Sequence, residues 1–128
     1  MYKRSLLLVM SFFIAASAWA QTTVRITNAD LVAGQDYNWT KNNIYVLDDM
    51  VFVKPGSKLF IQEGTVIKGA IGDGNDATGL VVTVGAQIFA EGTAEEPIIF
   101  TSEADDLNGS LTELDRGLWG GLVVLGDA

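Results

Sequence analysis

The most chemically suggestive side chains lie in a glycine-rich acidic loop between residues 69 and 79. Residues 72–77 read GDGNDA, which matches the GxGxxA pattern of dinucleotide-binding loops. That pattern binds pyrophosphate where it opens a helix, but here the strand-like residues 79–82 follow and two aspartates would repel phosphate. The stretch therefore predicts a turn and no nucleotide site.

The same loop offers oxygen atoms of the kind that calcium binds, from Asp73, Asn75 and Asp76. The spacing departs from the EF-hand loop, because Val84 stands where the closing bidentate glutamate belongs. Polar side chains in turns commonly form local hydrogen bonds instead. We therefore assign no metal ligand, and a calcium-dependent adhesion module is the third functional option.

A second acidic segment spans residues 103–117. Its charged side chains are Glu103, Asp105, Asp106, Glu113, Asp115 and Arg116. Paired carboxylates hydrolyse glycosides when they are held about 5 Å or about 6.5–9.5 Å apart. Proximity along a loop does not establish such a spacing, so the segment predicts a solvated acidic excursion.

The composition narrows the possible chemistry further. The chain has no histidine and no cysteine, which removes the commonest general base, the usual zinc ligands and the nucleophilic triads that need either residue. It carries 16 acidic against 8 basic residues, a formal net charge of −8. Such a surface repels nucleic acid. We predict no catalytic residue and no cofactor, and the chain leans towards a non-enzyme.

The first 20 residues have the layout of a secretory signal peptide. Lys3 and Arg4 precede an apolar run over residues 6–16, and Ala18-Trp19-Ala20 forms a small-x-small cleavage pattern before Gln21. The run is shorter than the roughly 20 residues of a spanning helix. We predict secretion through the periplasm to the outside or the cell surface, with no membrane span after cleavage.

The remaining chain repeats a glycine-punctuated unit. Residues 51–69 and 82–102 each run from a strand through a glycine turn to a second strand and the tripeptide Glu-Gly-Thr, at 63–65 and 91–93. Gly56 and Gly85 lie 29 residues apart, of which about ten form the acidic loop. About 20 residues remain, which is close to one coil of a solenoid.

Two all-β folds compete for this pattern. A sandwich needs antiparallel hairpins with tight turns, whereas a β-helix stacks equivalent strands of successive coils about 4.8 Å apart. Stacking places Gly56 on Gly85, one Glu-Gly-Thr on the other, the GLVV of residues 79–82 on that of 121–124, and Phe60 above Phe89. We therefore predict an all-β, right-handed parallel β-helix.

The predicted organisation has three parts. Residues 1–20 form the signal peptide, residues 21–43 an edge strand and a capping connector, and residues 44–128 the first coils of the β-helix. Tyr37 and Trp39 are expected to cover the core, and Trp119 to close a coil by packing across Gly120 and Gly121. Because a strand at 121–125 lacks a capping unit, we expect an incomplete solenoid of little more than two coils that associates edge to edge.

Three segments also suggest a family: VFVKPGSKLFIQEGTVIKG, GAQIFAEGTAEEPIIFTS and WGGLVVLG, at residues 51–69, 85–102 and 119–126. They resemble the N-terminal part of large secreted, pectin-lyase-like parallel β-helix proteins of Bacteroidota-type bacteria, a family without an agreed activity. The resemblance implies export to the cell surface. Lyases of this class use a basic residue with an acidic calcium cluster, and Lys54, Lys58 and Lys68 occupy outward or turn positions that offer no matching set.

These observations favour a secreted or cell-surface β-helix segment with a structural or binding role and no catalytic site of its own. Its expected partners are carbohydrate or other cell-surface components. The alternative is the N-terminal part of a polysaccharide lyase or glycoside hydrolase whose active site lies beyond residue 128.

Overall fold

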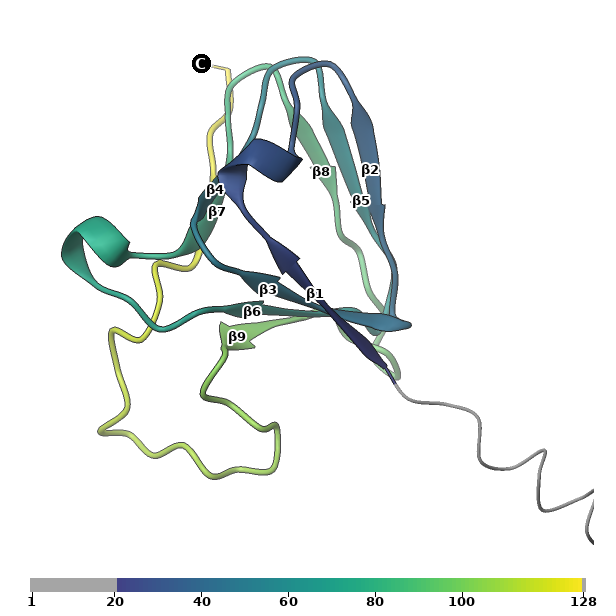
Figure 1. Cartoon of the computed structure of the whole chain (residues 1–128). Helices are drawn as coiled ribbons and strands as arrows, with labels where there is room; N and C mark the ends of the chain where they lie inside the picture. The colour runs from purple at the N-terminus through teal and green to yellow at the C-terminus, as the bar shows by residue number, and fades with distance from the viewer. Residues whose placement is uncertain (1–20, 128) are drawn as a thin grey trace, which may run out of the picture.

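The computed structural model describes residues 21–127, which form three parallel β-sheets arranged as the sides of a prism (Figure 1). Within this range the helical elements are two short 3-10 turns, η1 (Asn28–Asp30) and η2 (Gly74–Asp76). The predicted all-β parallel β-helix is therefore confirmed. The predicted signal peptide lies outside the described residues.

The chain visits the three sheets in the same order on each turn. Sheet A contains β1 (Thr22–Ile26), β3 (Asn43–Leu47), β6 (Val66–Gly69) and β9 (Ile99–Ser102). Sheet C contains β4 (Met50–Val53), β7 (Gly79–Val82) and β10 (Leu122–Val124). Sheet B contains β2 (Asp36–Trp39), β5 (Lys58–Ile61) and β8 (Gln87–Phe89). Each coil thus runs from sheet A to the side of sheet C and then to sheet B.

The strand register confirms most of the predicted stacking. Phe60 pairs with Phe89 in a parallel ladder, and Leu122, Val123 and Val124 pair with residues 80–82. The predicted glycine turn is also repeated, since Gly56 donates its N–H to the Gly85 carbonyl at 2.9 Å. Gly34 extends this column by one coil, and all three glycines have φ near +80°. A side chain at Gly56 would crowd the Gly34 backbone in addition to being strained.

Two expectations are wrong in detail. A connector was expected within residues 36–43, but residues 36–39 form the strand β2, which pairs with β5. The β-helix therefore begins before Ile44, its expected first residue. The two Glu-Gly-Thr tripeptides are not in register, since Gly64 donates its N–H to the carbonyl of Glu96 rather than meeting Gly92. The segment between β8 and β9, residues 90–98, is longer than residues 62–65 between β5 and β6, and this shifts the alignment.

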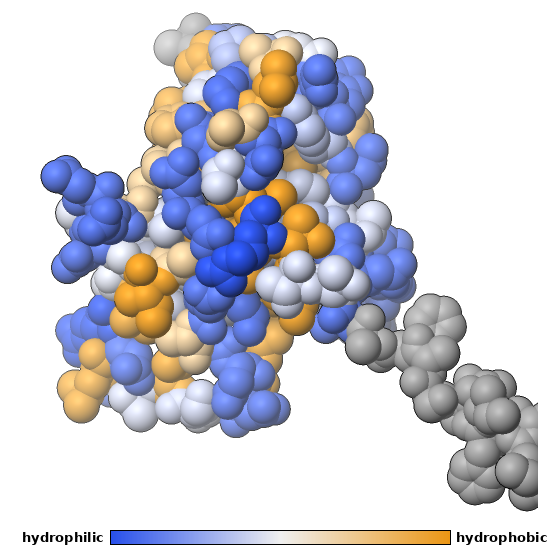
Figure 2. All heavy atoms as spheres, in the orientation of Figure 1, coloured by the Kyte–Doolittle hydropathy of each residue, from blue (hydrophilic) through white to orange (hydrophobic). Residues whose placement is uncertain are grey.

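Apolar residues from all three sheets fill the interior. The alternation is clear in β5, where Leu59 and Ile61 are buried while Lys58 and Phe60 are exposed. Trp39 is buried and its ring stacks on Tyr45 with 4.8 Å between centroids, and Tyr37 packs against the same core. The predicted covering role of both aromatic residues is confirmed. On the face that Figure 2 shows, hydrophilic residues surround separate apolar patches.

Candidate functional site

The outer face of sheet B carries a column of side chains that the alternation within strands turns away from the core. Asn38 of β2 pairs with Phe60 of β5, and Phe60 pairs with Phe89 of β8. The two phenylalanines are 36% and 43% exposed, although large aromatic side chains usually bury their surface. An exposed aromatic pair on a rigid sheet is therefore the first feature to explain.

The rings of Phe60 and Phe89 lie face to face. Their centroids are 4.8 Å apart and their planes differ by 9°, which matches the spacing of the strands that carry them. One face of Phe89 thus rests on Phe60. In the described part of the chain β8 is the last strand of sheet B, so no further strand covers the opposite face of Phe89.

A groove of about 520 Å³ runs beside this pair. We call it the sheet B groove; its lining comprises Asn38, Trp39, Thr40, Phe60, Ile61, Gln62, Glu63, Phe89, Glu91, Gly92 and Thr93. The floor is aromatic and aliphatic, and the turns that follow β5 and β8 supply the polar rim. A mainly apolar floor with a few polar groups is the usual composition of a small-molecule site.

Backbone and side-chain hydrogen bonds hold the rim in place. Gln62 donates its N–H to the Trp39 carbonyl at 2.9 Å, and its side-chain oxygen accepts the Lys41 N–H at 3.1 Å. On the other turn, the Thr93 hydroxyl oxygen accepts the Glu96 N–H at 2.9 Å. The side chains of Glu63 and Glu91 form no hydrogen bond or ion pair with another described residue. They are the rim groups left to meet a ligand.

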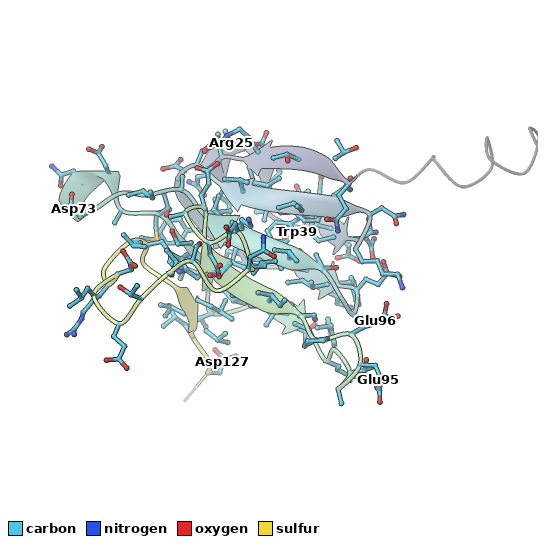
Figure 3. The ribbon with its side chains drawn as sticks, turned by 90° about the horizontal axis from the view of Figure 1, so that it is seen from below. Arg25, Trp39, Asp73, Glu95, Glu96 and Asp127 are labelled. Carbon is cyan, nitrogen blue, oxygen red and sulfur yellow. The ribbon has the colours of Figure 1, made fainter. Side chains whose placement is uncertain are left out.

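The acidic loop at residues 72–77 lies away from this groove. Its η2 turn leads into β7 rather than into an α-helix, as predicted, and a side chain at Gly72 would collide with the Asp76 carbonyl. In Figure 3, Asp73 projects on the side opposite Glu95 and Glu96. Within residues 21–127 no group of three or more histidine, cysteine, aspartate or glutamate side chains is placed to hold a metal ion.

The carboxylates of the excursion are engaged in local turns. Asp105 accepts hydrogen bonds from the Thr101 hydroxyl and the Leu107 N–H, and Asp106 accepts from the Asn108 N–H and the Ser110 hydroxyl. These bonds favour the ionised forms and lower the pKa of both groups below the ordinary value of 3.8. Neither residue lines the sheet B groove, so the excursion and the groove are separate features.

Arg25, in the first coil, connects the acidic segment 103–117 to the rest of the β-helix. The guanidinium of Arg25 donates to Asp48 at 2.6 Å and to Glu103 at 2.8 Å, and these bonds raise its pKa. Lys68 donates to the Asp105 carbonyl at 2.7 Å. The predicted outward or turn positions of the lysines are confirmed, and Lys54 donates to the carbonyls of Asn28 and Leu31.

Trp119 closes one corner of the last coil. A Cβ placed on Gly69 would lie 2.5 Å from the Trp119 ring, so the indole rests directly on the glycine backbone of β6. The sequence predicted packing across Gly120 and Gly121, whereas the structure places the indole on Gly69 of the preceding coil. Trp119 therefore has a structural role at a distance from the sheet B groove.

A family model described as a pectate-lyase like beta helix domain matches residues 31–128. The chain belongs to this pectate-lyase-like β-helix family. The match starts within the first coil, before Ile44, in agreement with the pairing of β2 and β5. Comparisons with curated proteins and with solved structures found no match. Within residues 21–127 of this family member, no helix is long and apolar enough to cross a membrane.

The sequence analysis did not identify the aromatic pair as a site. A usable signal is present, since Phe60 lies between inward Leu59 and Ile61, and Phe89 follows inward Ile88 at the equivalent position. Two outward phenylalanines at matching positions of successive coils must stack in a β-helix. No sequence signal predicted that Asn38 would line the groove beside Phe60, because residues 36–39 were expected to be a connector.

Proposed function

We propose that this β-helix domain binds carbohydrate in the sheet B groove, as a secreted or cell-surface module with no catalytic site of its own. The observation that carries the proposal is the stacked, exposed Phe60–Phe89 pair beside free acidic and amide side chains. The family description, which refers to an enzyme class acting on a plant polysaccharide, supports the same ligand class.

The two parts of the groove match the two kinds of surface on a sugar. A pyranose ring presents apolar C–H groups on its faces and hydroxyl groups around its edge. The exposed aromatic surface of Phe60 and Phe89 suits the first, and the side chains of Gln62, Glu63 and Glu91 suit the second. The rigid sheet holds the aromatic rings in place before binding, which reduces the entropy lost on association.

The proposed location follows from the N-terminal sequence. Residues 1–20 have the layout of a signal peptide, and the resemblance to exported bacterial β-helix proteins supports delivery to the cell surface. N-terminal sequencing of the secreted protein should begin at Gln21. Retention of residues 1–20 in the exported protein would contradict this part of the proposal.

A polysaccharide lyase or glycoside hydrolase is the second candidate, and the family description favours it. Glu63 and Glu91 line one groove and are the acidic side chains that an oligosaccharide there would meet. Incubation of the protein with the bound glycan, followed by chromatography of the products, separates the two functions. We expect the glycan to be recovered intact.

Titration calorimetry with a panel of oligosaccharides tests the binding role. Phe89→Ala should weaken binding by about tenfold or more, because it removes one ring of the stacked pair that lines the groove. Leu114→Ala is the control, since Leu114 is exposed on the excursion away from the groove. Binding by both variants at the wild-type affinity would contradict the assigned site, and absence of binding by the folded wild type would contradict the function.

A further inference from the structure

The charged side chains that line the sheet B groove are negative, whereas a negatively charged polyuronate would need positive ones. Two of the lining residues, Glu63 and Glu91, are acidic, and the other polar ones are uncharged. None of the lining residues, all of which the structure describes, is basic. A polyuronate such as pectate carries a carboxylate on each sugar, so its recognition depends on lysine, on arginine or on a cation that bridges acidic side chains, and within residues 21–127 no group of three or more such side chains is placed to hold a metal ion.

The surroundings of the groove add to this negative character. Glu95 and Glu96 lie beside each other (Figure 3) in the turn that follows the rim residue Thr93, and Glu95 has no basic partner among the described residues. The neighbouring cation is Lys41, whose ammonium is already paired with Glu96 at 3.0 Å. Lys41 is therefore not free to compensate Glu63 or Glu91.

Lys58 is the basic residue of β5 and is exposed on the same face of sheet B. It lies two residues before Phe60, about 7 Å along the strand, and does not line the groove. Its register neighbours are Asp36 and Gln87, so an acidic residue stands beside it. Lys58 thus forms a separate column and gives the groove no cation.

We infer that the sheet B groove selects glycans without acidic sugars, either neutral or containing amino sugars, and disfavours polyuronates. This inference rests on the carbohydrate-binding function proposed above. A uronate bound in this groove would bring its carboxylate beside the two carboxylates that line it, those of Glu63 and Glu91. Like charges so placed oppose binding, whereas an ammonium group of an amino sugar would be attracted.

The test compares three unbranched hexasaccharides by titration calorimetry against the full chain: β-1,4-linked glucose, β-1,4-linked glucosamine at pH 6, and α-1,4-linked galacturonate. We expect the glucose or glucosamine hexamer to bind at least about tenfold more tightly than the galacturonate hexamer. Galacturonate binding as tight as the others would overturn this inference and leave the carbohydrate-binding function standing. Failure of all three to bind the folded chain would overturn both.

Charge-removing variants locate the source of the selectivity. Glu63→Gln combined with Glu91→Gln should raise the affinity for galacturonate and lower that for glucosamine, each by about threefold or more, and leave glucose within twofold. Lys58→Gln is the matched control and should change none of the three. If the double variant retains the wild-type order with unchanged ratios, the two glutamates do not determine the selectivity and the inference fails.

Discussion

The two ends of the β-helix bury equivalent residues to very different extents. In sheet C, Leu80 and Val82 of β7 are 0% and 1% exposed, whereas Leu122 and Val124, which pair with them in β10, are 39% and 57% exposed. In the first coil, Leu31 and Trp39 are buried although they also belong to a terminal layer.

The difference arises from what covers each end. At the N-terminal end, η1 takes the place of a sheet C strand. The Asn28 side-chain oxygen accepts the hydrogen bond from the Phe52 N–H, which a backbone carbonyl of a neighbouring strand would otherwise accept. Lys54 and Ser57 then hold the following segment by donating to the carbonyls of Leu31 and Val32. At the other end, the excursion is tied to sheet A through Lys68 and leaves Leu122 and Val124 exposed. An inward position of a terminal layer is thus buried where a neighbouring segment packs over it, and exposed where none of the described residues does.

The largest effect should come from comparing equivalent leucines in the two layers. Leu80→Ala should lower the free energy of unfolding by about 2–5 kcal/mol, because it opens a cavity in a filled layer. Leu122→Ala should cost less than about 1 kcal/mol, since the side chain is partly solvated already. Urea denaturation of both variants measures the difference, and equal losses would show that the two layers are equally packed.

A chain that consists of residues 21–128 alone should associate with a second copy of itself through the strand edges and apolar side chains that it leaves exposed. Unpaired strand edges and exposed apolar side chains at one end favour pairing between chains. Sedimentation velocity should show a mass that rises with concentration, and Leu122→Asp should weaken association about tenfold or more. Val32→Asp, at an exposed position of the N-terminal end, is the control. A wild type that stays monomeric at all concentrations would refute the prediction.

Trp119 gives partial cover to the last coil, and Gly69 is the position that tests it. Gly69→Ala should displace the indole, because a Cβ would lie 2.5 Å from the ring, and should cost about 1–3 kcal/mol. Tryptophan fluorescence should shift towards that of an exposed indole. Gly126→Ala, where a Cβ meets nothing within 4 Å, should leave both the stability and the spectrum unchanged. An unchanged spectrum in Gly69→Ala would contradict the described packing.

Replacing a buried polar group in a middle coil should raise the stability of the protein, by less than the losses expected above. The hydroxyl of Thr65 is buried and has no hydrogen-bond partner among the described residues. Thr65→Val keeps the shape and removes the unsatisfied group, so it should raise the free energy of unfolding by about 1 kcal/mol. Thr23→Val, at an exposed position of the edge strand β1, should change it by less than about 0.5 kcal/mol. A destabilised Thr65→Val variant would show that the hydroxyl has an unrecognised partner.

The smallest expected effect is a loss of protection from hydrogen exchange in residues 103–117 at low pH. The pKa values of Asp105 and Asp106 are lowered by their turn hydrogen bonds, so the stabilisation they give is present above about pH 4 and lost as the pH falls through the lower folded values. Hydrogen exchange of residues 103–117 should therefore accelerate below pH 4, after correction for the intrinsic rate, before the sheets open. Asp105→Asn should show faster exchange of this segment at neutral pH. Equal protection at pH 3 and pH 6 would contradict the role of these carboxylates.

Local sequence patterns determined much of the architecture. The repeated glycine turn predicted that Gly56 stacks on Gly85, and the repeated GLVV predicted the pairing of β7 with β10; the structure confirms both. These predictions succeed because in a parallel β-helix equivalent residues of successive coils lie directly above one another, so a repeat in sequence becomes a contact in space.

Only the tertiary structure decided which outward side chains gather in a groove. Asn38 lies beside Phe60 because a segment without a clear strand pattern pairs with β5. Glu63 and Glu91 line the same groove although the turns that carry them differ in length. Arg25 reaches Glu103 across 78 positions of sequence. Alternation specifies which side of a strand faces the core, but the lengths of the turns and the pairing of distant strands set which outward residues become neighbours.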